Sequence, residues 1–393
     1  MMPIFALKGN LVLSDSILNR GLLVMEGQRI TGVYAPEYPF KEERAQVFDY
    51  GDMYIAPGLV DLHLHGALGK DVMDGQKESI RTIAEHQANN GVTSFLGSTI
   101  SAPMDSVLEA IQVIKNTAKE SLPSEILGVH VEGPFLSKQE KGAHTASFIR
   151  GLTKKDFKKL AESLSGWHPI LSLAPEAEKN MRWIARLKDQ GFVVAIGHSG
   201  ATYDQALESF ANGVTHATHL YNAMSGFDHR EPGVVGAVLD SDDVTAELIA
   251  DGIHVHPAAL RLAVARKGPE KICLVTDSMM ATGVGNGVYK WGEEEIEVHG
   301  NRAKIRGSEV LAGSVLTLRE AVKNMVDWTD VSLNRAINMA SLNPARVLGL
   351  DSEIGSLRIN KLANIVVLDR DFNVVDTLLR GKSVLKKGSQ HDR

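Results

Sequence analysis

The chain has 393 residues, of which 44% are hydrophobic and 23% are charged, and these values are close to those of soluble globular proteins. This composition excludes collagen-like, disordered and coiled-coil chains, and the length suffices for two or three domains or for one α/β barrel with an addition. The formal net charge is −6, and no dense block of Lys and Arg could follow a phosphate backbone. We therefore expect no nucleic-acid partner.

Cys273 is the only cysteine, which excludes an internal disulfide and a zinc site built from several thiolates. It lies in an apolar stretch and is expected to be buried in the core rather than reactive. No apolar run reaches about 18 residues, and the first residues lack the pattern of a secretion signal. We therefore expect a cytoplasmic protein without a membrane-spanning segment.

Both ends of the chain contain short alternating segments that turn residues interrupt, a pattern typical of β-hairpins. We expect residues 1–56 and 355–393 to form one small β-sandwich domain, and residues 57–354 to form a second domain. The strands predicted at the two ends are Ala6–Asn10, Gly21–Met25, Arg29–Val33, Gly355–Ile359, Ala363–Asp369 and Val374–Val384.

Between these ends, apolar runs of four to six residues alternate with helical stretches of ten to fifteen. Such alternation predicts parallel βα units, and the helices predicted over Ser79–Asn90 and Asn180–Gln190 are each followed by the Gly that commonly ends a helix. Eight units predict an α/β fold of the (β/α)₈ TIM-barrel type, whose chemistry collects at the carboxyl ends of the strands. The predicted barrel strands are Leu59–His63, Ser94–Gly97, Ile126–Val131, Ile170–Ala174, Val193–Ile196, His216–His219, Thr245–Ala250 and Ile272–Thr276.

Polar side chains follow the first and third of these strands. His63 and His65 alternate with leucines, so both imidazoles are expected on one face of the first strand. Such a pair is typical of a metal site, with hydrogen bonding at the barrel mouth as the alternative. Glu132 precedes a Gly-Pro turn after the third strand, where a carboxylate requires a cation or an ion pair.

The fifth, sixth and eighth strands end in the same way. His198 and His219 follow the fifth and the sixth, and Asp277 follows the eighth. His216 lies three residues before His219 and is expected to face away from it in a structural role. Because the carboxyl ends of the strands meet at one mouth, we expect the histidines His198 and His219 to lie beside Glu132 and Asp277.

Side chains of these types predict a metal-dependent hydrolase. Imidazoles and carboxylates without thiolates suit Zn²⁺ or Fe²⁺, with one coordination position left open. A divalent ion there would lower the pKa of a bound water molecule and polarise an amide carbonyl. Asp277 is the candidate general base, which takes the proton of the water and returns it to the leaving amine.

The motifs and their order resemble the amidohydrolase superfamily and, within it, the deacetylases of 6-phosphorylated N-acetylhexosamines. The resemblance covers nearly the whole chain, and it implies removal of the acetyl group from N-acetyl-D-glucosamine 6-phosphate in amino-sugar catabolism. The matching segments are Ala56–His65, Val131–Phe135, Lys141–His144, Gly197–Ser199, Thr218–Met224, Asp251–His254, Leu274–Asp277 and Leu311–Ser314.

The resemblance implies that Glu132, His198 and His219 hold the principal metal ion. In these deacetylases the glutamate takes the place that many relatives give to a carboxylated lysine on the fourth strand, and no lysine ends the fourth predicted strand here. Some members lack the histidines of the first strand and hold one metal ion. This chain retains His63 and His65, so a second ion is the expectation and wall residues are the alternative.

The resemblance also places the substrate and implies a homodimer. Arg230 suits a phosphate group because its planar guanidinium makes bidentate bonds, and in relatives this arginine reaches across a dimer interface; an ordinary surface charge is the alternative. His144 and His254 could each polarise the acetamide carbonyl or bind a sugar hydroxyl, and these roles stay open. The positions that match substrate contacts are Ala143, His144, Asn222, Ala223, Arg230, His254, Leu311, Ala312 and Gly313.

Three other functions remain as alternatives. N-Acetylgalactosamine 6-phosphate differs from the expected substrate in the configuration of one hydroxyl, which the motifs do not distinguish. A cyclic amidohydrolase, such as a dihydropyrimidinase or a dihydroorotase, is disfavoured by the missing lysine and by the presence of Asn222, Ala223 and Arg230. An inactive protein that only binds a sugar phosphate is disfavoured by Asp277. The native metal, among Zn²⁺, Fe²⁺, Mn²⁺ and Co²⁺, also stays open.

Overall fold

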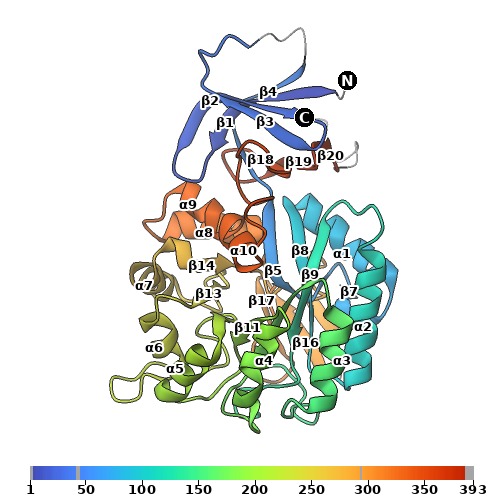
Figure 1. Cartoon of the computed structure of the whole chain (residues 1–393), viewed down its shortest axis with the longest axis vertical. Helices are drawn as coiled ribbons and strands as arrows, with labels where there is room; N and C mark the ends of the chain where they lie inside the picture. The colour runs from blue at the N-terminus through green and yellow to red at the C-terminus, as the bar shows by residue number, and fades with distance from the viewer. Residues whose placement is uncertain (1–2, 41–44, 293, 386–393) are drawn as a thin grey trace.

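The computed structural model describes residues 3–40, 45–292 and 294–385, so the outer ends of the two terminal segments lie outside the described residues. Figure 1 shows a barrel of strands and helices, with a smaller β-structure above it that both chain ends enter. The chain therefore leaves the small part once, builds the barrel and returns.

Eight parallel strands form the central sheet, in the spatial order β14-β13-β12-β11-β10-β9-β8-β5. A bridge between Leu64 and Ser278 joins the two edges, and the N–H of His65 donates to the Ser278 carbonyl at 2.8 Å. The sheet thus curls into the predicted barrel. Its strands are β5 (Leu59–Leu64), β8 (Val92–Thr99), β9 (Glu125–Glu132), β10 (His168–Leu173), β11 (Val193–Ile196), β12 (Val214–Ala217), β13 (Thr245–Leu248) and β14 (Ile272–Leu274).

Helices surround the barrel, which explains why its strands are continuous apolar runs rather than alternating ones: every residue of β5 and β8 is buried. The predicted helix over 180–190 begins with a 3₁₀ turn at Asn180–Trp183 before α4. Among the described residues, no helix combines the length and the apolar character needed to cross a bilayer. The helices are α1 (Lys77–Asn89), α2 (Met104–Thr117), α3 (Lys154–Leu164), α4 (Ile184–Asp189), α5 (Tyr203–Asn212), α6 (Gly233–Asp240), α7 (Pro257–Lys267), α8 (Leu318–Trp328), α9 (Leu333–Met339) and α10 (Leu342–Val347).

The two chain ends share one seven-stranded sheet, here called the terminal sheet, in the order β20-β19-β18-β4-β1-β2-β3. Its centre is β4, which the sequence analysis did not predict and which pairs with β1 on one side and with β18 on the other. The strand predicted at Gly355–Ile359 is wrong: the segment forms turns, with φ of +85° at Gly355. The strands are β1 (Ile4–Val12), β2 (Ile17–Glu26), β3 (Arg29–Tyr34), β4 (Gln46–Pro57), β18 (Ile365–Leu368), β19 (Val374–Leu379) and β20 (Lys382–Ser383).

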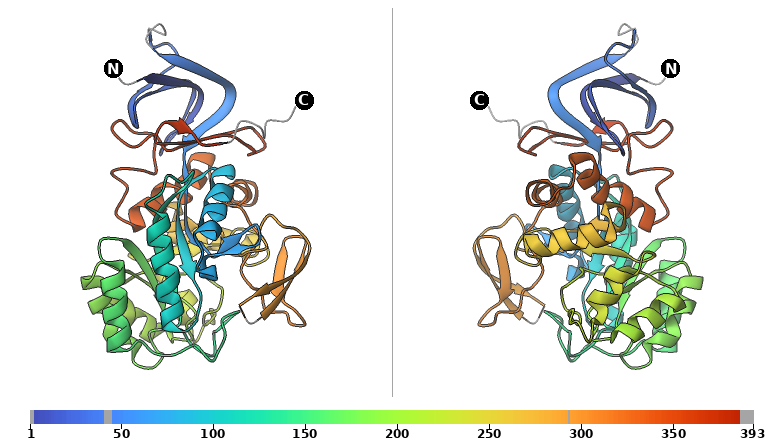
Figure 2. Two further views of the ribbon diagram at one scale, coloured as in Figure 1. Left: turned by 90° about the vertical axis from the view of Figure 1, so that its right-hand side faces the viewer. Right: turned by 90° about the vertical axis from the view of Figure 1, so that its left-hand side faces the viewer.

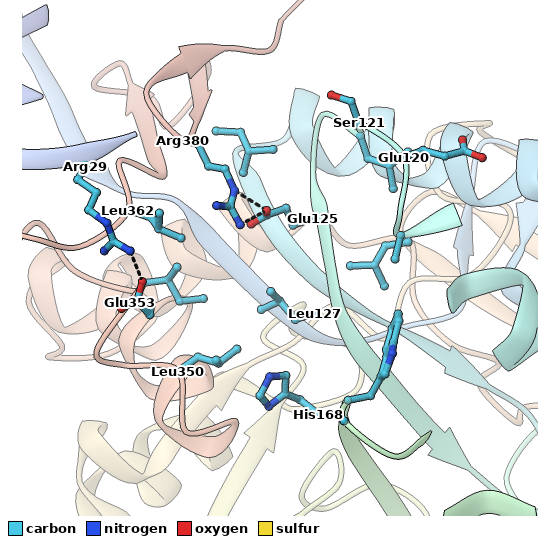
Figure 3. A pocket seen from close by; sticks show the side chains of 17 residues that line it. Arg29, Glu120, Ser121, Glu125, Leu127, His168, Leu350, Glu353, Leu362 and Arg380 are labelled. Carbon is cyan, nitrogen blue, oxygen red and sulfur yellow. Dashed lines mark hydrogen bonds and ion pairs between the residues drawn. The ribbon is translucent and has the colours of Figure 1, made fainter. Parts of the chain in front are cut away.

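A cleft of about 670 Å³ lies where the terminal sheet meets the barrel, and Figure 3 shows its lining. Two ion pairs line it: Arg29 with Glu353 at 2.9 Å, and Arg380 with Glu125 at 2.6 Å. Glu125 is the first residue of β9, and the candidate ligand Glu132 is the last. At about 3.3 Å per residue, roughly 23 Å separates the two, so the cleft and the predicted active site lie at opposite ends of the barrel.

A second addition follows β14: a three-stranded antiparallel sheet of β15 (Gly287–Trp291), β16 (Glu294–His299) and β17 (Arg302–Ile305). The sequence analysis did not predict it, and Figure 2 shows it standing out from the side of the barrel. A short hairpin of β6 (Gly66–Ala67) and β7 (Lys70–Asp71) follows β5. The indole N–H of Trp291 donates to the Asp71 carboxylate at 2.7 Å, which ties the added sheet to this hairpin.

Two glycines that follow helices allow a matched test of the packing between the barrel and the terminal sheet. Gly91 and Gly191 adopt φ of +80° and +82°, so alanine at either pays a left-handed strain of about 1–2 kcal/mol. A Cβ at Gly91 would lie 2.6 Å from Cγ2 of Val366 in β18, whereas a Cβ at Gly191 meets no atom within 4 Å. We expect Gly91→Ala to cost about 1–3 kcal/mol more than Gly191→Ala, measured by chemical denaturation. Equal losses in the free energy of unfolding would show that Val366 moves aside from the new Cβ at no cost.

Candidate active site

The predicted ligands all come from the carboxyl ends of barrel strands, and all are buried. His63 lies in β5 with His65 just after it, Glu132 ends β9, His198 and His219 each lie two residues beyond β11 and β12, and Asp277 lies three residues beyond β14.

Three of these residues have left-handed backbones, which are uncommon for side chains other than Gly: φ is +47° at His198, +32° at His219 and +49° at Asp277. Hydrogen bonds to residues of other barrel strands hold Asp277 and His219 in place. The N–H of Asp277 donates to the His63 carbonyl at 2.8 Å, and the N–H of His219 donates to the Glu247 carboxylate at 3.1 Å. Strain that the surrounding structure maintains in this way is typical of functional sites.

Glu132 stands at the centre of the cluster and divides it in two. Its Oε1 lies 3.0 Å from Nε2 of His219 and 3.2 Å from Nε2 of His198. Its Oε2 lies 3.1 Å from Nε2 of His65 and 3.3 Å from Nε2 of His63. One carboxylate therefore faces two separate pairs of imidazoles.

Asp277 belongs to the second pair. Its Oδ1 lies 3.3 Å from Nε2 of His65 and 3.6 Å from Nε2 of His63. The two ring nitrogens are themselves 3.3 Å apart, which confirms that His63 and His65 point to one face. His216 is not part of the cluster, since its Nε2 lies 3.1 Å from Glu247.

The hydrogen bond of His198 shows which of its ring nitrogens faces the cluster without a proton. Its Nδ1 lies 2.8 Å from the carbonyl oxygen of Glu140, and because a carbonyl only accepts, the ring proton of the neutral imidazole sits on Nδ1. The lone pair of Nε2 then points at the Glu132 carboxylate and at Nε2 of His219, 3.1 Å away. Acceptors that face one another at such distances repel unless a cation lies between them.

The separations also fit a metal ion. Two donors that each lie about 2.0–2.1 Å from one zinc ion in a tetrahedral site are about 3.3–3.4 Å apart, close to the spacings around Glu132. Nitrogen and carboxylate donors are those that divalent transition metals accept. Within the described residues, His63, His65 and Asp277 form one group with metal-ligand spacing, and Glu132 and His198 belong to another. The site therefore fits a divalent metal.

The imidazoles decide the charge of the two acids. Burial alone would raise the pKa of Glu132, but the imidazoles of His63, His144, His198 and His219 outweigh it and hold that pKa well below its usual range. Burial would also raise the pKa of Asp277, and its histidine neighbours hold that pKa below the usual range as well. Both acids are therefore carboxylates near neutral pH, as metal binding and proton acceptance require.

His144 differs from the other imidazoles. Its Nδ1 accepts a hydrogen bond from the N–H of Ser101 at 3.1 Å, so the ring proton sits on Nε2, which lies 3.5 Å from Glu132. Burial lowers the pKa of His144 to about 4, so the ring is neutral. His254 is oriented the other way, with Nδ1 2.7 Å from the Asp251 carboxylate. Toward the substrate cavity, His144 thus offers the N–H of its Nε2, and His254 offers the Nε2 atom that Asp251 does not contact.

A cavity of about 300 Å³ opens over the cluster. Two predicted contacts do not line it: Ala312 is buried in an apolar cluster with Trp291, and Arg230 is exposed on the loop over 226–232. The predicted contacts that do line it are Ala143, His144, Asn222, Ala223, His254, Leu311 and Gly313.

The sequence analysis missed several residues of the site, among them Glu247 and Trp291. Glu247 lies within β13, fully buried, and contacts His63. The sequence could have indicated it, because an acidic residue inside an apolar strand is buried, and a buried carboxylate costs free energy unless it has a partner. Trp291 lines the cavity, with its ring centroid 5.5 Å from that of His65. Its signal was the alternation of Val288, Tyr289, Lys290 and Trp291, which is typical of a strand.

The metal-fitting cluster at the mouth of a (β/α)₈ barrel places the chain among the metal-dependent barrel enzymes, and the comparison with known families narrows this class. The model of the amidohydrolase family matches residues 54–384. The chain belongs to this family.

Its relatives include an N-acetylglucosamine-6-phosphate deacetylase of Bacillus subtilis (strain 168), which is 37% identical over 94% of each chain. An N-acetylgalactosamine-6-phosphate deacetylase of Escherichia coli O157:H7 is 40% identical over 84% of this chain and 87% of its own. Among solved structures, a mutant N-acetyl-D-glucosamine-6-phosphate deacetylase from Mycobacterium smegmatis, in complex with N-acetyl-D-glucosamine-6-phosphate, matches with a TM-score of 0.92 and 31% identity. That match covers 98% of this chain and all of the other (100%).

The geometry around Glu132 predicts the result of removing one imidazole. His198→Ala deletes a donor that faces Oε1 and should abolish tight binding of one equivalent of divalent metal, because each site has few donors to lose. Elemental analysis after equilibration with Zn²⁺ measures this loss. His168→Ala is the control: its imidazole lines the cleft at the opposite end of the barrel, so the metal content should stay normal. A full metal complement in purified His198→Ala would contradict the assignment.

Proposed function

We propose that the chain hydrolyses the acetamide bond of N-acetyl-D-glucosamine 6-phosphate, which gives D-glucosamine 6-phosphate and acetate. The observation that carries the proposal is the position of Asp277. Its carboxylate lies beside the imidazole pair of His63 and His65 and also lines the cavity, so one face meets the metal-fitting cluster and the other meets the space for substrate. The names of the relatives supply the sugar phosphate.

Asp277 takes the proton of the attacking water in this reaction. It then delivers that proton to the nitrogen of the sugar, which leaves as an amine, so that no net proton is lost by the residue. Its low pKa is consistent with a group that begins the cycle as a carboxylate. A divalent ion held by Glu132, His198 and His219 would activate the water and polarise the carbonyl.

The neutral imidazoles have different tasks in this proposal. His144 donates its Nε2–H toward the acetamide oxygen as negative charge develops there, which is the work of an oxyanion donor. His254, which Asp251 holds through Nδ1, binds a hydroxyl of the sugar. Zn²⁺ and Fe²⁺ suit the donors best, with His63, His65 and Asp277 as the place for a second ion.

N-Acetylgalactosamine 6-phosphate is the second candidate substrate. The relative with that activity is 40% identical, compared with 37% for the N-acetylglucosamine-6-phosphate deacetylase of Bacillus subtilis, although it covers less of this chain. The two sugars differ in one hydroxyl, and a site that hydrogen-bonds a particular hydroxyl discriminates strongly against an analogue that misplaces it.

A homodimer would complete the substrate site. Among the described residues that line the cavity, none is Lys or Arg, so a phosphate group there lacks a cationic partner from the same chain. Arg230 lies on an exposed loop with Phe227, whose exposed fraction is 65%. An exposed aromatic side chain beside an arginine is typical of an interface, and we propose that this loop enters the cavity of a second copy.

Acetate release from both 6-phosphorylated sugars by metal-loaded protein tests the activity. We expect turnover of at least one sugar, with Asp277→Asn lowering kcat by about 10² to 10⁴ while substrate and the ion at Glu132, His198 and His219 still bind. The substitution Asp277→Asn keeps the size of the side chain but removes its ability to accept a proton. A stable, metal-loaded Asp277→Asn protein with nearly normal kcat would end the proton-transfer role, and no release from either sugar would refute the activity.

Arg230→Ala should weaken use of the phosphorylated sugar far more than use of the unphosphorylated one, because the lost charge-assisted bonds have no counterpart in a neutral substrate. The ratio of kcat/KM for the two substrates measures this. Arg182→Ala offers a control, since Arg182 stacks on Trp183 away from the cavity. Equal losses on both substrates in Arg230→Ala would make the arginine structural.

A further inference from the structure

Glu247 is a fully buried carboxylate that the proposed reaction does not use. It lies in β13, near the carboxyl end of the strand, and its exposed fraction is 0%. It does not line the substrate cavity, which excludes direct contact with the sugar. A buried charge is costly unless every oxygen has a partner, so its contacts show what it does.

Three donors surround this carboxylate. Oε2 lies 3.0 Å from Nδ1 of His63 and accepts from the N–H of His219 at 3.1 Å. Oε1 lies 3.1 Å from Nε2 of His216. Glu247 thus stands directly behind the cluster, on the side of His63 that faces away from Glu132.

The contact with His63 decides which nitrogen of that ring is free. A metal ligand must be a neutral imidazole, which carries one proton, and because an ionised carboxylate can only accept, that proton sits on Nδ1 and points at Glu247. Nε2 then presents its lone pair 3.3 Å from Glu132 Oε2 and 3.6 Å from Asp277 Oδ1. The other tautomer would place an N–H in the space where a cation must fit.

His65 shows the contrast. Its Nδ1 is buried and has no hydrogen-bond partner among the described residues, so none of them fixes its tautomer in the way that Glu247 fixes that of His63. The two histidines of the first strand are therefore held unequally. His63 is oriented from behind, and His65 is confined by packing against the ring of Trp291.

We propose that Glu247 is a positioning residue that holds His63 in the Nδ1–H tautomer and thereby makes it a metal ligand rather than a wall residue of the cavity. This inference rests on the metal site of the proposed function. Carboxylates that hold a ligating imidazole in this way typically contribute 10- to 100-fold to metal affinity.

Glu247→Gln tests the proposal because it keeps the size of the side chain and removes the charge. Zn²⁺ affinity of the intact chain, measured by competition with a chromophoric chelator, should fall about 10- to 100-fold for the ion at His63 and His65. Asp156→Asn is the control. Asp156 is also buried, but its partners are Arg150 and Thr153 at the start of α3 rather than an imidazole ring. It should lower the melting temperature and leave Zn²⁺ affinity within about threefold of the original.

A double-mutant cycle separates positioning from a general structural role. In a His63→Ala background, adding Glu247→Gln should change Zn²⁺ affinity less than threefold, because the imidazole that Glu247 positions is already gone. The other contact should survive, since the amide oxygen of Gln can still accept from the N–H of His219. Equal losses in both backgrounds would overturn the proposal. So would a lower melting temperature of Glu247→Gln with unchanged Zn²⁺ affinity, which would make the carboxylate purely structural.

Nitrogen-15 spectra of histidine-labelled, metal-free protein give a second readout, which remains usable if Glu247→Gln binds no metal. At a pH high enough for this ring to be neutral, the His63 signal, assigned by its absence in His63→Ala, should show a protonated Nδ1 in the original chain and a mixture of tautomers in Glu247→Gln. Glu247→Asp retains the charge and should recover part of the Nδ1–H population. An Nε2–H tautomer in the original chain would overturn the proposal. Because these measurements involve no sugar, failure to release acetate would count against the proposed function alone.

Discussion

The active site depends on one constraint: hydrogen-bond acceptors are brought together in a space that contains too few protons to satisfy them. Glu132 faces four Nε2 atoms at 3.0–3.3 Å, and at least two of these rings keep their proton on the far nitrogen, at Glu140 and at Glu247. Such an arrangement is favourable around a cation and costs free energy without one. The fold must therefore supply enough stability elsewhere to hold the metal-free cluster together.

The barrel supplies this stability, because its strands hold the residues at their carboxyl ends in fixed positions. Parallel strands covered on both faces bury nearly every side chain, and the left-handed residues at His198, His219 and Asp277 turn the chain immediately after the sheet stops. This is why spacing along the sequence predicted which polar side chains lie together at the mouth of the barrel. A polar residue one to three positions beyond an apolar run has little choice of location once eight runs close into a barrel.

Other features could not be predicted from local patterns. Glu247 matters through contacts with His63, 184 residues earlier in the chain, and Trp291 through contacts with a hairpin 220 residues earlier, so neither spacing nor periodicity predicts the pairing. The segment Gly355–Ile359 alternates like a strand, but Leu357 is buried in the core of the terminal sheet while the backbone forms turns. Here tertiary packing outweighed the alternation. For Arg230, the single chain offers no contact with the cavity at all.

The path of the chain through the terminal sheet affects how the protein is made. β4 is complete early in synthesis, yet its neighbour β18 begins at Ile365, near the end of the chain. At about 5–20 residues per second, the roughly 300 intervening residues take about 15–60 s to emerge from a ribosome. During that time Ile55 lacks the Ile365, Val367 and Leu378 side chains that complete its apolar cluster, and one edge of β4 stays unpaired. A nascent chain of this topology exposes an unpaired strand edge that can pair with the neighbouring chains on a polysome. A protein that lacked the last few dozen residues would keep this edge unpaired permanently.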